Sequence, residues 1–224
     1  MLKAKIDEVF SSIQGEGIYQ GKKQVFVRFF GCNLHCSFCD TPQNDFQEYS
    51  SEELFKAIES LDNHSHSISF TGGESLLQKD FLKEIMNLCK WHDKTIYLET
   101  NGTLPEALEE VIDLVDIVAM DFKLPSSTGE LTFWDEHKKF LTIAGQKEVF
   151  VKTVVCKSTQ ETDIISVVET IKCAGRESAL VLQPNFFEMS EELTAKIDEY
   201  RKYCKQYLQD VRVLPQLHKI LSIK

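Results

Sequence analysis

Three cysteines lie close together in the segment GCNLHCSFCDTP, at residues 31–42. They are Cys32, Cys36 and Cys39, with the spacing C-x3-C-x2-C. The glycine, asparagine, aspartate and proline of this segment favour a loop, in which three thiolates can converge without help from distant chain. A closed structural metal site needs four protein ligands, whereas a site that performs chemistry keeps a position open. Three thiolates therefore suit a [4Fe–4S] cluster whose fourth iron binds a small molecule.

Two other interpretations of these cysteines stay open at this point. Free cysteines often act as small buried hydrophobic residues, although three in one polar loop are an unusual case. A structural zinc ion would need His35 or a remote residue as its fourth ligand, and neither a second C-x2-C pair nor an H-x3–5-H pair follows. His35 also lies between two of the cysteines, where it would reach the same ion only with difficulty. The spacing favours the cluster.

The motif resembles the signature of the radical S-adenosylmethionine superfamily, in which an aromatic residue, here Phe38, precedes the last cysteine. This resemblance implies that the methionine part of S-adenosylmethionine chelates the unique iron and that Phe38 packs near the adenine. The superfamily places a GGE motif against the methionine amino group, and Gly72, Gly73 and Glu74 match it.

Further segments narrow the resemblance to one family. In chain order they are SIQGEG, FVRFFGCNLHCSFCDT, TGGESLL, ETNG and the terminal LHK. Together they resemble the 7-carboxy-7-deazaguanine synthase family of the queuosine and deazapurine pathway. One departure is Ser75, which stands where the family often has proline and loosens that loop slightly.

The family resemblance implies a lyase reaction. An electron from the reduced cluster cleaves the sulfonium, and the resulting 5′-deoxyadenosyl radical takes hydrogen from C6 of 6-carboxy-5,6,7,8-tetrahydropterin. Ring contraction with loss of ammonia follows, and the cofactor carries the hard step while the protein orients it. The resemblance also leads us to expect a homodimer and an electron donor such as flavodoxin.

The same resemblance assigns the site residues. Thr41 would bind Mg²⁺, which takes oxygen ligands, beside the substrate carboxylate; the alternative is a threonine that only turns the chain. Arg28 has a guanidinium fork suited to that carboxylate. The pterin contacts would be Ile13, Gln14, Gly15, Glu16, Arg28 and Thr71. By the resemblance, the cofactor contacts would be Phe38, Cys39, Asp40, Gly73, Pro125, Ser126 and Ser127. Residue types at the expected strand ends add Gly72, Lys123 and Gln183, and Thr100 and Asn101 as hydrogen-bond partners of ribose hydroxyls. Glu74 would either balance the cofactor ammonium or support its loop.

Two competing functions remain. A glycyl-radical-enzyme activase shares the cysteine spacing and the size. It would, however, need a protein-sized docking surface, and it would have no reason to keep Gln14, Glu16 and Arg28 together near the cluster. A zinc-stabilised binding module belongs to a different class. Anaerobic reconstitution with iron and sulfide separates the zinc module from the radical enzymes.

Composition limits the partners. The chain has 224 residues and a net charge of −10, which argues against nucleic acid or an anionic membrane as the main partner. The N-terminus does not resemble a signal peptide, and no apolar run approaches the ~20 residues that span a bilayer. Seven cysteines, three of them in one motif, fit the reducing cytoplasm. We expect the other four, Cys89, Cys156, Cys173 and Cys204, to be inert residues on apolar faces.

Strand and helix patterns alternate about six times, which predicts a parallel sheet and a single α/β domain over residues 1–224. Because the chain is short for an eight-unit barrel of about 250 residues, we expect a partly open barrel of six units, (β/α)6. The expected strands are 4–10, 24–30, 67–70, 95–99, 116–120, 148–155, 179–182 and 211–214, with 11–21 rich in turns. Helices are expected after a Ser50–Glu53 capping box, around 81–89, at 105–114, 131–144 and 164–171, and after Ser190.

Polar motifs follow four of these strands: TGGE, ETNG, DFK and QPN. Active sites of parallel barrels lie at the carboxyl ends of the strands. The sequence therefore predicts that these motifs meet the cysteine loop at one rim.

Overall fold

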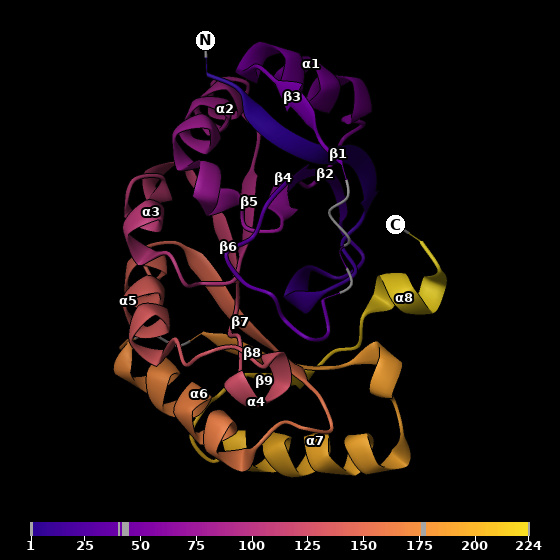
Figure 1. The fold of residues 1–224 in the computed structure, drawn as a ribbon, viewed down its shortest axis with the longest axis vertical. Coiled ribbons are helices and arrows are strands. Elements are labelled where there is room, and N and C mark those ends of the chain that lie inside the picture. Colours follow the sequence, from indigo (N-terminus) through magenta and orange to yellow (C-terminus); the bar gives the residue numbers. More distant parts are fainter. Residues whose placement is uncertain (1, 40, 42–44, 176–177, 224) are drawn as a thin grey trace.

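The computed structural model describes residues 2–39, 41, 45–175 and 178–223. Its strands form one sheet in the order β3-β1-β2-β4-β5-β6-β7-β8-β9, and β3 and β9 remain edges (Figure 1). The sheet is thus open, which confirms the predicted partial barrel. Parallel pairing joins β2 (Lys23–Phe29), β4 (Ser67–Gly72), β5 (Ile96–Thr100), β6 (Ile117–Asp121), β7 (Glu148–Val155), β8 (Ala179–Pro184) and β9 (Val211–Val213). The antiparallel strands β1 (Ala4–Ile13) and β3 (Gln47–Tyr49) extend the β2 side.

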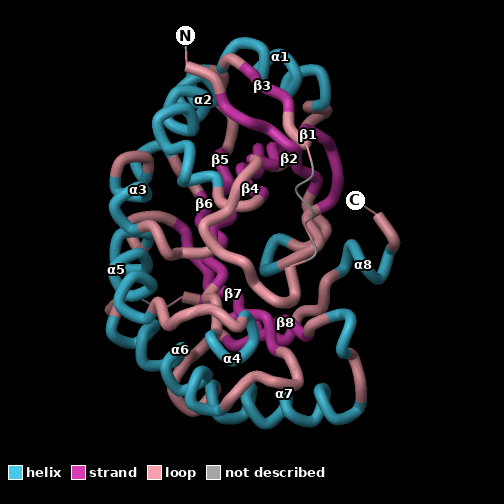
Figure 2. The backbone as a smooth tube through the Cα atoms, viewed as in Figure 1, coloured by secondary structure: helices cyan, strands magenta, loops and turns pink. Residues whose placement is uncertain are grey.

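Six helices of the described chain cover the outer face of the sheet, and Figure 2 shows them along one side of the strands. They are α1 (Ser51–Leu61), α2 (Lys79–Trp91), α3 (Pro105–Glu109), α5 (Trp134–Ala144), α6 (Glu161–Cys173) and α7 (Glu191–Cys204). The other helices of the described chain are η1 (Gly17–Tyr19), η2 (Ser75–Gln78), η3 (Ile112–Leu114), α4 (Pro125–Thr128), η4 (Phe186–Glu188) and α8 (Leu217–Leu221). None of the helices in the described part of the chain is long and apolar enough to cross a membrane.

The central strands are buried on both faces, as parallel strands covered by helices must be. β4 shows this directly, because its first five residues are all buried. Phe70 contributes to the main core between sheet and helices, together with Phe29 from β2 and Phe81 from α2. The ring centroid of Phe29 lies 6.3 Å from that of Phe70 and 6.4 Å from that of Phe81. This core fixes the strand ends that carry the polar motifs.

A second, smaller core lies on the inner face of the sheet. Tyr97 and Phe150 pack there against Tyr19 of η1, with the Tyr19 and Tyr97 ring centroids 5.7 Å apart. Gly17 must be glycine, because its φ is +66° and an added Cβ would lie 2.4 Å from the Phe150 ring. Since these residues fill the amino-terminal half of the barrel, the open space is left at the carboxyl ends of the strands.

The predicted helix caps are present. Ser50 Oγ accepts a hydrogen bond from Glu53 N at 3.3 Å, and Glu53 Oε2 accepts one from Ser50 N at 2.9 Å. At α7, Ser190 Oγ accepts from Leu193 N at 3.2 Å. Each bond satisfies a backbone donor that the first helical turn leaves unpaired, so short-range sequence signals set these helix starts.

Long-range pairing moved several predicted boundaries. β1 continues to Ile13, where it pairs with Lys23, although residues 11–13 belong to a turn-rich segment. β3 was not predicted, because its three residues form a strand only against β1. The predicted helix at 105–114 divides into α3 and η3, α5 begins at Trp134 instead of residue 131, and α4 was missed.

The expectation of inert cysteines holds for three of the four. Cys89, Cys156 and Cys204 are buried, as predicted, whereas Cys173 is exposed. Cys173 is the last residue of α6, where the helix turns toward solvent, so its placement on an apolar face was wrong.

Gly72→Ala should destabilise the protein by at least about 2 kcal/mol, because two effects add. Gly72 has a φ of +122°, and an added Cβ would lie 2.3 Å from the carbonyl oxygen of Phe29 on the adjacent strand. Urea unfolding measures the change. Gly129→Ala is the matched control, because Gly129 also has a positive φ but nothing within 4 Å, so it should lose only about 1 kcal/mol. Equal losses would contradict the steric argument.

Candidate active site

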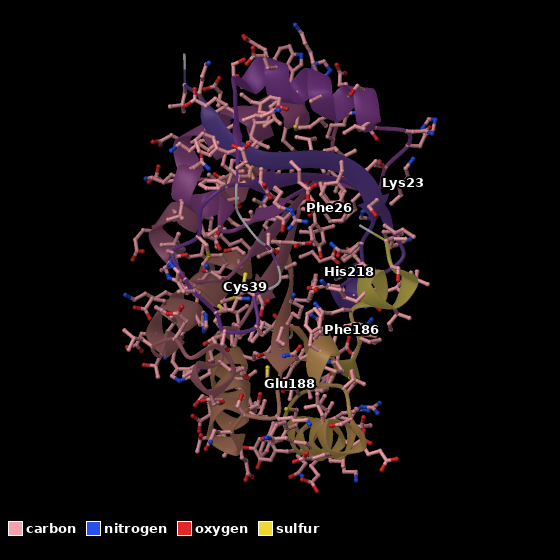
Figure 3. The ribbon with its side chains drawn as sticks, turned by 45° about the vertical axis from the view of Figure 1, so that its right-hand side comes forward. Lys23, Phe26, Cys39, Phe186, Glu188 and His218 are labelled. Atoms are coloured by element: carbon pink, nitrogen blue, oxygen red, sulfur yellow. The ribbon has the colours of Figure 1, made fainter. Side chains whose placement is uncertain are left out.

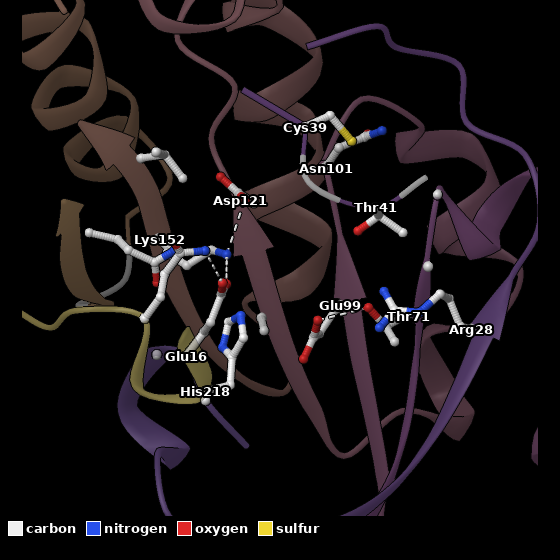
Figure 4. A pocket seen from close by; sticks show the side chains of 18 of the residues that line it. Glu16, Arg28, Cys39, Thr41, Thr71, Glu99, Asn101, Asp121, Lys152 and His218 are labelled. Atoms are coloured by element: carbon white, nitrogen blue, oxygen red, sulfur yellow. Dashed lines mark hydrogen bonds and ion pairs between the residues drawn. The ribbon is translucent and has the colours of Figure 1, made fainter. Parts of the chain in front are cut away.

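A cavity of about 1020 Å³ lies at the carboxyl ends of the parallel strands. Its walls are β1, β2 and the ends of β4 to β8, together with the segment 12–17 (the SIQGEG loop), residues 31–39 and 41 (the cysteine loop), and the C-terminal segment that carries α8. Cys39 and His218 both line it, from the cysteine loop and the C-terminal segment respectively (Figures 3 and 4). A concave site with converging polar groups is the usual form of a small-molecule site.

The cysteine loop is anchored to several strand ends. Glu74 N donates to Gly31 O at 2.8 Å, which ties the start of the loop to the end of β4. Ser37 donates its N–H to Thr128 O and its hydroxyl to Ser127 O, both at 2.9 Å. These bonds join the middle of the loop to α4, so the loop has a defined place over the cavity.

The three thiols of the loop are free and all line the cavity. Burial raises the pKa of Cys36 to about 11, although the ammonium of Lys123 acts against this, and burial also raises the pKa of Cys32. Lys123 lies 5.7 Å above the ring of Phe38. Because a metal binds the thiolate, ligation must release these protons.

The donor set fits an iron–sulfur cluster with one open iron. Within the described residues, no group of three or more His, Cys, Asp and Glu side chains is placed to hold a single metal ion. A [4Fe–4S] cluster binds each thiolate through a different iron, so its ligands need not converge on one point. Three free thiols that face one cavity satisfy that requirement, and His35 also lines the cavity.

Most of the predicted site residues meet in this cavity, although they come from residues 13 to 183. Gln183 is fully buried, and neither atom of its side-chain amide has a hydrogen-bond partner within the protein. The predicted residues that line the cavity are Ile13, Gln14, Gly15, Glu16, Arg28, Cys32, Cys36, Phe38, Cys39, Thr41, Thr71, Gly72, Gly73, Thr100, Asn101, Lys123 and Gln183. Asp40 lies outside the described residues.

Glu74 was predicted at the cofactor but does not line the cavity. Its side chain is 1% exposed and accepts hydrogen bonds from Leu76 N at 3.1 Å, Asn101 N at 2.8 Å and Thr100 Oγ1 at 3.0 Å. Burial raises the pKa of Glu74 to about 7, against the lowering effect of these donors. The carboxylate therefore supports the loops that form the rim.

Pro125, Ser126 and Ser127 also lie outside the cavity lining. The hydroxyl of Ser126 donates to Asp163 and accepts from Gln160 N at 2.9 Å. Ser127 Oγ lies 2.6 Å from Thr159 Oγ1. These hydrogen bonds attach α4 to the residues at the start of α6. Because α4 in turn accepts hydrogen bonds from Ser37, it supports the cysteine loop from outside the cavity.

An ion network that the sequence did not predict crosses the cavity floor. Lys152 Nζ pairs with Glu16 and, at 3.1 Å, with Asp121 Oδ2, which also lies 2.8 Å from Lys123 Nζ. The register of β6 with β7 places Asp121 beside Lys152. Burial alone would raise the pKa of Glu16, but the ion pair with Lys152 outweighs it and lowers the pKa to about 2. The carboxylates likewise outweigh burial and raise the pKa of Lys152.

Another carboxylate is Glu99, which belongs to the predicted ETNG motif but had no assigned role, and it lines the cavity from the end of β5. Thr71 Oγ1 donates to its Oε2 at 2.8 Å, and Gln14 Nε2 donates to its Oε1 at 2.6 Å. Gln14 is only 3% exposed, and its other bonds run to Gln24 and Glu16 N. Gln14 thus positions Glu99 and the SIQGEG loop.

Arg28 lines the cavity from β2, where it pairs with Thr71 of β4. Its Nε donates to Glu8 Oε1 at 2.9 Å and lies 3.9 Å from Asp7 Oδ2, and its guanidinium lies 5.6 Å from the centre of the Phe10 ring. These contacts come from β1, which pairs with β2 beside it. They fix the direction of the guanidinium toward the cavity, as Figure 4 shows.

The C-terminal segment closes on the SIQGEG loop. Leu217 N donates to Gly15 O at 2.8 Å, and Gln216 Nε2 donates to Glu16 Oε1 at 2.9 Å. Gly15 leaves room for His218, because an added Cβ would lie 2.3 Å from His218 Nδ1. The terminal LHK was the only sequence signal for this contact, and it did not identify Gln216 or His218 as site residues.

Comparisons with known proteins agree with this geometry. Residues 26–146 match the model of the radical SAM superfamily. The chain is 37% identical to the 7-carboxy-7-deazaguanine synthase of Geobacter sulfurreducens over 98% of this chain and 97% of the relative. It is 34% identical to the enzyme of that name from Methanothermobacter thermautotrophicus over 100% and 99%. The chain belongs to the 7-carboxy-7-deazaguanine synthase family.

Two solved structures share the fold of this member of the synthase family. The crystal structure of QueE from Escherichia coli matches with a TM-score of 0.67 at 20% identity, over 97% of this chain and 96% of that one. A domain of the pyruvate-formate lyase-activating enzyme from Bacteroides vulgatus matches with a TM-score of 0.53 at 17% identity, over 66% and 99%. At these identities the likeness concerns the fold alone.

Lys152→Gln should lower the free energy of unfolding by up to about 3 kcal/mol at pH 7, because Lys152 contributes most of the lowering of the Glu16 pKa from 4.5 to about 2. Because the folded-state pKa is depressed, this contribution is complete above about pH 4.5 and is lost as the pH falls toward 2. Urea unfolding of both proteins should therefore show a difference that shrinks below pH 4.5.

Lys139→Gln is the control, because Lys139 is exposed on α5 and should change stability by less than about 0.5 kcal/mol. If the deficit of Lys152→Gln were the same at pH 7 and pH 3, the ion pair with Glu16 would not be its cause.

Proposed function

We propose that this protein converts 6-carboxy-5,6,7,8-tetrahydropterin to 7-carboxy-7-deazaguanine with loss of ammonia. The observation that carries the proposal is one cavity in which three free thiols face a polar wall of carboxylates and a guanidinium. Family membership and the names of the relatives support it. When bound, the [4Fe–4S] cluster and S-adenosylmethionine supply the radical chemistry, while the chain orients the reactants and excludes water.

Cys32, Cys36 and Cys39 would hold the cluster, and the adjoining strand ends would hold S-adenosylmethionine. Gly72 and Gly73 carry no side chain between their backbone and the cavity, so the cofactor can approach closely. The side-chain amide of Gln183 has an unpartnered donor and an unpartnered acceptor. Because buried polar groups are normally hydrogen-bonded, a bound cofactor would supply the missing partners.

The polar wall suits a pterin that carries a carboxylate. Arg28 would pair with that carboxylate, because a guanidinium fork matches two carboxylate oxygens. Glu16 and Glu99 would accept hydrogen bonds from the amine and amide edge of the ring. Lys152 keeps Glu16 ionised, so this carboxylate remains an acceptor at neutral pH.

Thr41 would bind Mg²⁺ through its hydroxyl, with the substrate carboxylate as a second ligand. Thr41 lines the cavity, and Figure 4 shows it between Cys39 and Arg28. Magnesium keeps several waters and takes few protein ligands when a substrate supplies the others. A single threonine hydroxyl is therefore a sufficient protein contribution.

We further propose that residues 1–224 form one domain, since one continuous sheet and one main core extend through the described chain. We also propose that it acts in the cytoplasm, where thiols stay reduced. A homodimer and an electron donor such as flavodoxin complete the proposal. Sedimentation of the reconstituted protein and reduction by candidate donors measure these two points.

Cys36→Ala should abolish the absorbance near 400 nm and the cleavage of S-adenosylmethionine, because two thiolates cannot hold the cluster. Anaerobic reconstitution followed by iron and sulfide analysis measures this loss. Cys173→Ala is the matched control, since Cys173 is exposed outside the cavity and its removal should leave both properties intact. Full activity in Cys36→Ala would refute the cluster assignment.

Arg28→Ala should weaken binding of the carboxytetrahydropterin at least tenfold, because a buried carboxylate that loses its partner costs several kcal/mol. Uncoupled cleavage of S-adenosylmethionine should survive, since the cysteine loop is unchanged. Calorimetric titration of the reconstituted enzyme measures the affinity.

The same titration tests the magnesium ion. Added Mg²⁺ should strengthen binding of the pterin, and Thr41→Ala should remove that gain.

Arg212→Ala is the control for the lost charge, because Arg212 is exposed on β9 and pairs with Asp210. If Arg28→Ala bound the pterin as tightly as the unaltered protein, the substrate site would be misplaced and an activase function would gain support. An affinity that ignores both Mg²⁺ and Thr41→Ala would remove the magnesium ion from the proposal.

A further inference from the structure

The sulfur of Cys32 faces two N–H donors. Leu34 N lies 3.4 Å from Cys32 Sγ, which is a local contact within the cysteine loop. Asn101 Nδ2 lies 4.0 Å from the same sulfur and comes from the ETNG segment (residues 99–102) after β5. The second donor therefore depends on tertiary structure.

The orientation of the Asn101 amide is fixed by its neighbours. Its Oδ1 accepts from Thr103 N at 3.0 Å and from Thr103 Oγ1 at 2.6 Å. A backbone N–H can only donate, so this atom must be the amide oxygen, and Nδ2 must point the other way. One Nδ2 hydrogen goes to Asn33 Oδ1 at 2.9 Å, which leaves the other for Cys32.

The backbone of Asn101 is held equally firmly. Its N–H donates to Glu74 Oε2 at 2.8 Å, and its carbonyl oxygen lies 3.2 Å from Nε2 of His137. His137 is fully buried and stacks on Phe122, with the ring centroids 4.6 Å apart. Asn33 Nδ2 donates to Thr103 Oγ1 at 2.8 Å and closes the network. Asn101 itself is 5% exposed, so its amide has little freedom to turn away from the sulfur.

We propose that Asn101 donates an N–H···S hydrogen bond to the Cys32 thiolate of the bound cluster and thereby raises the reduction potential of that cluster. On reduction the cluster takes one electron from its donor, and part of the added negative charge resides on the thiolate sulfurs. A hydrogen bond to a more negative acceptor is stronger, so the donor stabilises the reduced state more than the oxidised state. This role rests on the cluster proposed above and is distinct from the S-adenosylmethionine contact expected from the sequence.

The test is a redox titration, monitored by electron paramagnetic resonance, of the anaerobically reconstituted protein without substrate. In Asn101→Ala the ratio of reduced to oxidised cluster at a fixed potential should fall about tenfold, a shift of about 59 mV to more negative values for one electron. Asn101→Asp keeps the size and the Thr103 bonds but replaces the donor with an anionic oxygen, so its shift should be larger and in the same direction.

Thr103→Val is the matched control. It removes one bond to Asn101 Oδ1 and the bond to Asn33, while Thr103 N still orients the Asn101 amide. Its potential should equal that of the unaltered protein. A shift in Thr103→Val as large as that in Asn101→Ala would show that loop order is responsible, and a shift in Asn101→Asp alone would show a simple charge effect; either result overturns the proposal. Absence of iron from the unaltered protein would instead overturn the proposed function.

Discussion

The rim of the barrel depends on the buried carboxylate of Glu74. Its backbone N–H holds Gly31 at the start of the cysteine loop, and its side chain accepts from Leu76, Thr100 and Asn101. One residue therefore sets the spacing between the cysteine loop, the end of β4 and the end of β5. A carboxylate without partners would be costly at this depth, and three donors offset that cost. The donors must stay in place, which makes the rim rigid where the cofactor would lie.

Charge is distributed unevenly around the cavity, although the whole chain is acidic. Arg28 stands on the β2 side, held by carboxylates of β1, while Lys123 and Lys152 lie on the β6–β7 side with Asp121 and Glu16. Each cation is paired, so each can be desolvated without losing its charge. A substrate with an anionic end and a neutral ring edge is suited to such a wall, because paired charges keep fixed directions.

The open barrel and its inner core explain where the site can form. Tyr19, Tyr97 and Phe150 fill the amino-terminal half, and the C-terminal segment closes on the SIQGEG loop. The cavity is therefore bounded by residues from both ends of the chain. The α4 serines and Glu74 lie behind its wall and hold the loops from outside, which separates the residues that can touch a ligand from those that support them.

The sequence by itself determined the local features: the cysteine spacing, the caps at Ser50 and Ser190, the strand–helix alternation and the polar motifs at the strand ends. These follow from short-range hydrogen bonds and from hydrophobic periodicity, which act within a few residues. Most of the site residues that it identified also line the cavity, because a family signature marks them.

Only the tertiary structure decided which polar groups meet. The Lys152–Asp121 pair follows from the register of two strands, the Gln14–Glu99 bond joins residues 85 positions apart, and Gln216 reaches Glu16 across nearly the whole chain. Glu74 and the α4 serines carry the residue types of a ligand contact, yet burial and neighbouring donors turned them into supports. Spacing along the chain cannot contain this information, because depth and partner direction arise only when distant strands pair and desolvate the groups between them.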